Sequence, residues 1–182
     1  MNKYHPLSLA TIGLMALLGC STPATIPDFQ QPTEPIPEVE AKDLAPASPI
    51  NYTYGRHLNG IWEAKLIPAG NVRVKDRMAA IPMPHHFAVE VPVGGTVRGR
   101  LLGERSAWFN VRAVNPMGIG QGPGLNQNKI RSGEPQATYW NPGETPSTVY
   151  FVVGAGGNSG NSGEAFTLEI IRGRLDPKVR QK

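Results

Sequence analysis

The chain has 182 residues, a net charge of +4 at pH 7 and a single cysteine. One cysteine excludes an internal disulfide framework, and the lack of a basic run interleaved with aromatics disfavours nucleic acid as a partner. The length suits one domain with one core, so stability must come from packing.

The N-terminus has the pattern of a bacterial signal peptide. Lys3 supplies a positive charge, and the stretch Leu7–Leu18 that follows is apolar or small and carries no charge. This stretch is shorter than the roughly 20 residues that a membrane-spanning helix needs. It ends in Leu17-Leu18-Gly19-Cys20, which resembles the lipobox of bacterial lipoproteins.

The lipobox resemblance implies three processing events. Residues 1–19 are removed by cleavage between Gly19 and Cys20, the Cys20 thiol receives a diacylglycerol, and the new amine is acylated, for example with palmitate. Each buried CH₂ contributes about 0.8 kcal/mol, so several chains on one residue make a lasting anchor. Because Ser21 stands where an aspartate would signal inner-membrane retention, we expect the outer membrane, with the protein facing the periplasm.

Residues 20–50 are predicted to be the lipidated cysteine and a disordered, Pro-rich tether. Residues 21–50 contain seven prolines, few large apolar residues and a net charge of −4. Such a segment is expected to stay extended and to bury no core, with a reach of up to roughly 90 Å. Residues 51–182 carry a net charge of +7, which favours acidic partners such as lipopolysaccharide phosphates, peptidoglycan carboxylates or an acidic protein face.

Residues 51–172 are predicted to form an all-β domain, a single antiparallel β-sandwich of jelly-roll type with about six to eight short strands. Apolar and polar residues alternate, and glycine and proline recur too often for a helix of useful length. Two of the strands, joined by a turn at Pro92-Val93-Gly94-Gly95, are expected to pair as a hairpin. The predicted strands are Ile61–Ile67, Val72–Lys75, His86–Val91 and Thr96–Leu102 (the hairpin), Ala107–Val114, Gln136–Trp140, Thr148–Gly154 and Ala165–Ile171.

A family resemblance rests on the order of several segments, namely Phe87–Val91, Val93-Gly94-Gly95-Thr96-Val97, Trp108–Val111, Gln136–Tyr139, Thr148–Val153 and Gly163–Ile170. From Ala79 to Ile171 this order resembles the bacterial pre-peptidase C-terminal (PPC) domain, which implies a β-sandwich. Members often carry aspartates, some of them calcium-binding, in the strand that corresponds to Ser106–Val111. Here that stretch has no aspartate, so the resemblance implies no calcium site.

Two glycine-rich loops stand out between the predicted strands. Pro116–Pro135 is long for a compact domain, and long loops often carry function. Gly154–Gly163 is expected to be a hairpin connection, because neither Gly-Lys-Ser/Thr nor a helix follows it. In the first loop, the residues predicted to contact a partner are Asn126, Gln127, Asn128, Lys129 and Arg131.

Met78, Met83, His85 and His86 are the residues that most resemble a metal-ligand set. Thioether and imidazole ligands suit copper in an oxidising compartment. Adjacent histidines on a strand point to opposite faces, however, so we expect no metal and no other cofactor. No serine lies in a nucleophile-elbow sequence and no carboxylate pair has a recognisable spacing, so we expect no catalytic residues and no enzyme activity.

These features together predict a periplasmic lipoprotein held at the outer membrane by the lipid on Cys20. It is expected to act as a non-catalytic binding or scaffolding module, for example as a subunit of a secretion, conjugation or surface assembly, with a protein or an acidic envelope polymer as partner. The alternative is a lipoprotein that resembles the periplasmic lysozyme inhibitors or binds glycan or peptidoglycan. The basic tail, residues 173–182, is either a solvated end or a segment that orders on an acidic partner.

Overall fold

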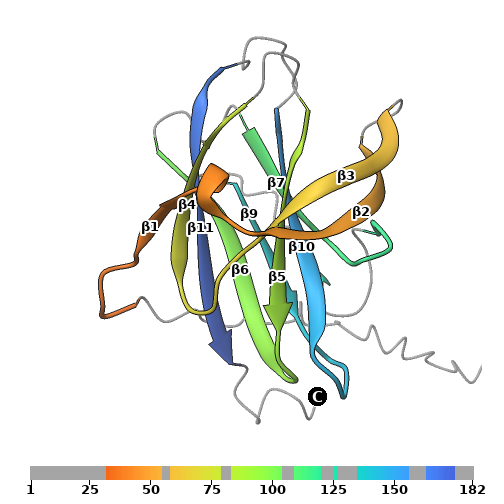
Figure 1. Cartoon of the computed structure of the whole chain (residues 1–182). Helices are drawn as coiled ribbons and strands as arrows, with labels where there is room; N and C mark the ends of the chain where they lie inside the picture. The colour runs from red at the N-terminus through yellow and green to blue at the C-terminus, as the bar shows by residue number, and fades with distance from the viewer. Residues whose placement is uncertain are drawn as a thin grey trace, which may run out of the picture.

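The computed structural model describes residues 32–54, 58–78, 83–103, 109–119, 125–126, 135–155 and 163–174. In these residues the chain forms two β-sheets that pack face to face, which confirms the predicted all-β sandwich (Figure 1). The elements are β1 (Glu38–Glu40), a 3-10 helix η1 (Ala41–Asp43), β2 (Pro46–Tyr54), β3 (Leu58–Leu66), β4 (Val72–Arg77), β5 (His85–Val91), β6 (Gly95–Leu102), β7 (Phe109–Val114), β8 (Leu125–Asn126), β9 (Gln136–Trp140), β10 (Ser147–Ala155) and β11 (Ala165–Arg174).

One sheet has six strands in the order β1-β4-β11-β6-β9-β8, and the other has five in the order β2-β3-β5-β10-β7. Neighbouring strands are antiparallel except for two pairs, β1 with β4 and β3 with β5, which are parallel. β11, the last strand of the described chain, lies in the interior of the six-stranded sheet between β4 and β6.

The main core lies between the two sheets and is made by every second residue of the central strands. β5 contributes Phe87, Val89 and Val91 to it, and all three are buried. Facing them are Leu168 and Ile170 of β11, neither of which is exposed to solvent. Because successive side chains of a strand point to opposite faces, the period-two pattern of the sequence places these residues inward.

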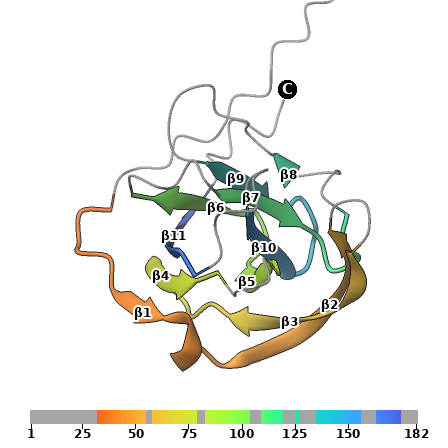
Figure 2. The same ribbon diagram turned by 90° about the horizontal axis from the view of Figure 1, so that it is seen from above.

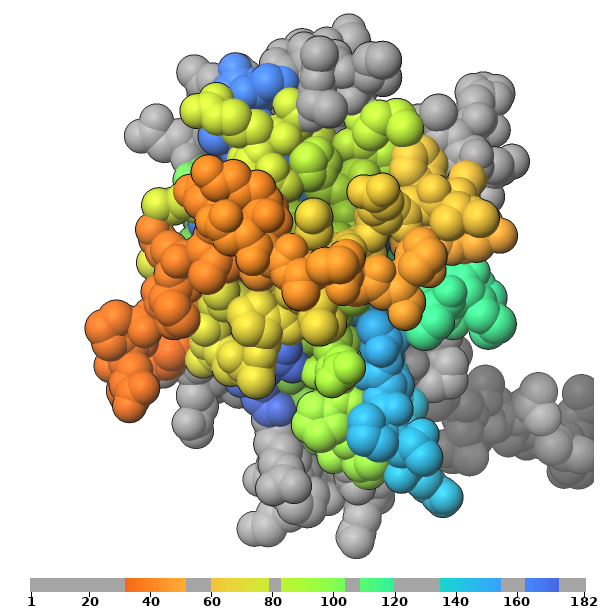
Figure 3. All heavy atoms as spheres, viewed as in Figure 1, coloured from red at the N-terminus to blue at the C-terminus, as the bar shows by residue number. Residues whose placement is uncertain are grey.

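A second apolar layer covers the outer face of the five-stranded sheet. The β2–β3 hairpin curls back over β5 and β10, as the two views at right angles show (Figures 1 and 2). Ile50 of β2 is 1% exposed and packs in a cluster with Val114, Tyr150 and Val152. The Tyr150 hydroxyl donates a hydrogen bond to the carbonyl of Ser48 at 3.2 Å. The space-filling view shows residues of β1 to β3 spread across this face (Figure 3).

The structure corrects the predicted tether. Residues 38–50 were expected to bury nothing, yet β1 pairs with β4 and β2 pairs with β3. Ala41 and Ile50 are buried, at 4% and 1% exposure. The prolines that made this region resemble a tether, Pro46 and Pro49, lie on an edge strand, where a missing N–H costs no ladder hydrogen bond. The prediction of a tether up to residue 50 is therefore wrong from residue 38 onward.

The predicted hairpin between β5 and β6 is also wrong. The turn is present, with the Gly95 N–H donating to the Pro92 carbonyl at 2.9 Å, but it carries the chain from one sheet to the other. Asn141, which is 1% exposed, holds this corner. Its side-chain amide donates to the Val91 carbonyl at 3.0 Å, and its backbone N–H donates to the Gly95 carbonyl at 3.0 Å.

Candidate functional site

A histidine and an aspartate from different sheets meet at one end of the sandwich. β4 ends and β5 begins at this end, which brings Asp76 next to His85. The His85 Nδ1 lies 2.6 Å from Asp76 Oδ2, and both side chains are 23% exposed. The other carboxylate oxygen, Oδ1, accepts a hydrogen bond from the Arg77 N–H at 2.8 Å. Both oxygens of Asp76 thus have partners within the protein.

The His85 ring is also held by an aromatic cluster. Phe166 meets its edge at nearly a right angle, with ring centroids 5.5 Å apart. Phe166 in turn contacts Phe87 and Phe109, at centroid distances of 6.3 and 5.6 Å. With a carboxylate on one nitrogen and a packed phenyl ring beside it, the imidazole has one preferred orientation.

His86 lies on the other face of β5 and takes no part in this end of the sandwich. Its ring stacks on Trp62 of β3 at a centroid distance of 5.6 Å. Burial, and to a smaller extent the neighbouring His85, lower the pKa of His86 to about 4. The two imidazoles therefore point apart, as strand alternation predicts.

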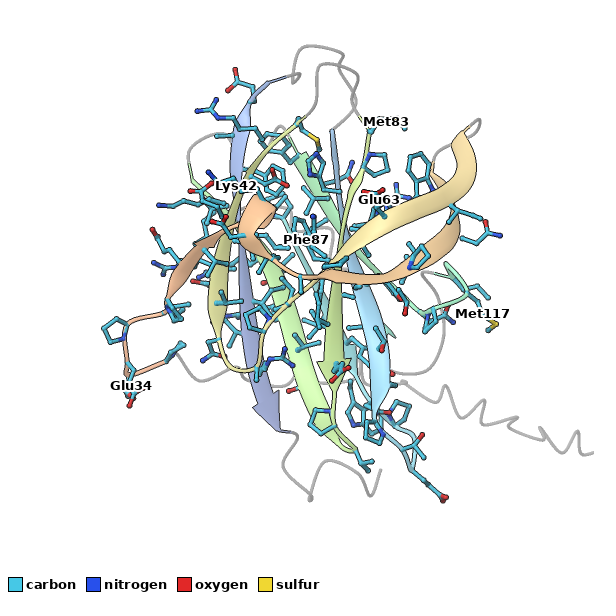
Figure 4. The ribbon with its side chains drawn as sticks, in the orientation of Figure 1. Glu34, Lys42, Glu63, Met83, Phe87 and Met117 are labelled. Atoms are coloured by element: carbon cyan, nitrogen blue, oxygen red, sulfur yellow. The ribbon has the colours of Figure 1, made fainter. Side chains whose placement is uncertain are left out.

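The two methionines of the suggested copper set differ in exposure. Met78 is 2% exposed and belongs to the core, whereas Met83 is 38% exposed. Figure 4 shows Met83 at the upper end of the molecule, above Phe87 of β5. Among the described residues, no group of three or more His, Cys, Asp or Glu side chains is placed to hold a metal ion.

A second feature is a compact turn after β7, at the start of the predicted contact loop. The Asn115 side-chain oxygen accepts hydrogen bonds from the N–H groups of Met117 and Ile119, both at 3.0 Å. The Asn115 N–H donates to the Ile119 carbonyl at 3.0 Å, and Gly118 adopts a φ of 74°. This turn presents Met117 at 73% exposure and Ile119 at 47% exposure.

The sequence did not single out Met117 and Ile119, although two large apolar residues in a Gly-rich loop are a usable signal. Of the residues predicted to contact a partner, Asn126 lies in β8, level with Thr138 of β9. The others, Gln127, Asn128, Lys129 and Arg131, lie outside the described residues, as do Gly19 and Cys20.

Part of the positive charge of the domain is compensated on the outer face of the six-stranded sheet. Glu169 of β11 is 2% exposed and lies between an arginine on each neighbouring strand. Arg73 Nε is 3.0 Å from one carboxylate oxygen, and Arg100 Nη2 is 2.6 Å from the other. Nearby, Lys75 Nζ lies 2.5 Å from Glu38 Oε2. Glu169 is already counted in the net charge of +7 for residues 51–182, whereas Glu38 precedes them, so its pairing with Lys75 reduces the positive charge that this face offers to an acidic partner.

No family model, no curated protein and no solved structure matches this chain. The PPC resemblance therefore stays a prediction from the quoted segments. In the part of the chain that the structure describes, no helix is long and apolar enough to cross a membrane.

Proposed function

We propose that this protein is a non-catalytic envelope lipoprotein that binds a partner protein through the turn Asn115–Ile119. The observation that carries the proposal is the exposure of Met117 and Ile119. Single exposed apolar residues are common, but here two large ones lie two positions apart in a turn fixed by four hydrogen bonds. The fourth of these is donated by the Gly118 N–H to the Asn115 carbonyl at 2.8 Å. A rigid apolar protrusion of this kind loses little conformational entropy when a partner covers it.

The anchor proposed for this function is lipid on Cys20, which follows the Leu17-Leu18-Gly19 motif. With β1 starting at Glu38, seventeen residues connect Cys20 to the sandwich. A polyproline segment of this length spans at most about 50 Å. The domain would then stand roughly half as far from the membrane as the predicted tether implied.

The arrangement of the two features supports a tethered binding module. Glu34, close to the first described residues, and Met117 lie on opposite sides of the molecule (Figure 4). A partner bound at the turn would therefore lie away from Glu34, near which the described part of the chain begins. This layout suits a protein that holds a neighbour at a limited distance from the outer membrane, with the domain on the periplasmic side.

Site-specific photo-cross-linking in intact cells tests the proposal. A photoreactive amino acid replaces Met117 in one full-length variant and Val93, which is 40% exposed on another turn, in a matched control. We expect a protein adduct at position 117 that Ile119→Asp abolishes, and none at position 93. Equal adducts at both positions, or none at position 117, would contradict a contact surface at this turn.

Membrane fractionation tests the anchor separately. We expect the parent chain in the outer-membrane fraction and Cys20→Ala outside it. Recovery of both proteins in the same fraction would contradict the lipid anchor. It would not bear on the contact surface, which the cross-linking tests.

A further inference from the structure

The His85–Asp76 pair leaves one imidazole nitrogen available as a ligand. A carboxylate can only accept a hydrogen bond, so Nδ1 is the nitrogen that donates across the 2.6 Å contact. In the neutral ring the lone pair is then on Nε2. Histidines that bind metals commonly donate their second nitrogen to a carboxylate in this way, which fixes the tautomer and raises the basicity of the ligand. Asp76 is a positioning residue in this arrangement.

Met83 is the nearest candidate for a second ligand along the chain. It precedes Pro84, and a residue before proline is confined to extended conformations. Residues two apart in an extended segment lie about 6–7 Å apart at Cα, close enough for both side chains to reach one ion. Met83 is 38% exposed and the His85 side chain is 23% exposed, so both residues are open to an ion from solvent.

The chemistry of these groups selects the kind of ion. Thioether and imidazole favour copper(I), whereas hard cations require several oxygen ligands. Both oxygens of Asp76 are engaged, by His85 and by the backbone of Arg77, so the carboxylate is poorly placed to recruit a hard ion. His86 is turned toward Trp62 and does not join the set.

We propose that Met83 and His85, the latter positioned by Asp76, form a binding site for a single copper(I) ion at this end of the sandwich. The proposal is independent of the partner-binding turn, because Met117 and Met83 lie far apart in the molecule (Figure 4). It departs from the sequence analysis, which expected no metal because adjacent histidines point to opposite faces, and it rests on Asp76 of another strand, which positions His85.

Copper(I) competition with a chromophoric chelator tests the site. The full chain is used with Cys20→Ser, which removes a competing thiol. We expect one equivalent to bind, Met83→Leu and His85→Gln each to weaken binding at least tenfold, and Asp76→Asn to weaken it about 10–100-fold. Met117→Leu removes a thioether on a more exposed residue that lacks the imidazole, and we expect it to leave copper(I) binding unchanged. X-ray absorption of the bound copper should show one sulfur and one nitrogen neighbour, with the sulfur lost in Met83→Leu.

Two results would overturn the proposal. One is a double variant, Met83→Leu with His85→Gln, that binds copper(I) as tightly as the parent. The other is displacement of the copper by an equal concentration of zinc, which would contradict a site for a soft ion. Because Met83 is exposed, its leucine variant should keep the parent's circular dichroism spectrum and melting temperature, so weakened binding could not be attributed to misfolding.

Discussion

Replacing Gly99 by alanine should damage the core at one defined contact. Gly99 lies in β6 on the face that meets the five-stranded sheet. A Cβ at this position would lie 2.4 Å from Cδ1 and 2.7 Å from Cε1 of Phe151. Carbon atoms rest at roughly 3.5–4.0 Å, so the ring would have to move by about 1 Å. Phe151 is fully buried, and its neighbours leave no open side for that movement.

The expected cost follows from this displacement. Adding a methylene to a packed core costs roughly 1–3 kcal/mol, and we expect about 2 kcal/mol for Gly99→Ala. For a domain of this size the melting temperature should fall by about 5–10 °C. If the loss comes from the ring, Phe151→Leu should relieve part of it, so the cost of Gly99→Ala should be smaller in that background.

Urea unfolding followed by circular dichroism measures the cost of Gly99→Ala in the parent chain and in the Phe151→Leu background. Gly60→Ala is the matched control, because it also places a methyl group on a strand glycine, yet its nearest neighbour is Trp62 at an ordinary 3.8 Å. We expect it to be neutral or slightly stabilising. The reasoning is refuted if Gly99→Ala unfolds at the same urea concentration as the parent, or if its cost is unchanged by Phe151→Leu.

Three further predictions concern polar groups. Arg100→Met should cost about 2 kcal/mol in urea unfolding, because it leaves the Glu169 carboxylate, 2% exposed, with one arginine, whereas Lys75→Met, which breaks an exposed pair, should not move the midpoint. The pKa of His86 is about 4 in the folded chain and 6.5 ordinarily, so the free energy of unfolding should keep its full value above pH 6.5 and fall by up to about 3 kcal/mol toward pH 4. Unfolding at several pH values should show this loss in the parent and not in His86→Gln. Arg172 donates to three backbone carbonyls from the loop before β4 and from β5, so Arg172→Lys, with one ammonium group, should lower the melting temperature, and an unchanged melting curve would show that these contacts contribute nothing.

The strands themselves could be predicted from alternation, because it reports burial directly. Gln136–Trp140 has the predicted bounds, and the strands predicted at Thr148–Gly154 and Ala165–Ile171 lie inside β10 and β11. Pairing could not be predicted in the same way. A tight turn between two alternating segments looks the same whether the second strand returns to its neighbour or crosses to the opposite sheet, and here Asn141, far along the chain, holds the crossing.

The candidate sites show a similar limit. Asp76 and His85 lie on strands that share no hydrogen bonds and belong to different sheets, so their contact depends on sheet packing. The N-terminal segment was misjudged because proline content signals an extended chain, and an edge strand is also extended. A tether and an edge strand differ in whether residues such as Ile50 are buried. The burial of Ile50 depends on contacts with β5 and β10, which come much later in the sequence.

The interior position of β11 has a consequence for how the chain reaches its native state. Residues 165–174 leave the ribosome after all the other described strands, yet they separate β4 from β6 and supply Leu168 and Ile170, which are fully buried. Until they arrive, the six-stranded sheet has a gap in its interior and the core lacks these two side chains. We therefore expect the complete fold to form only after this segment has been synthesised, since its contacts are distant in sequence. A chain that must thread through a membrane channel while unfolded, as the proposed export requires, gains time for translocation from this strand order.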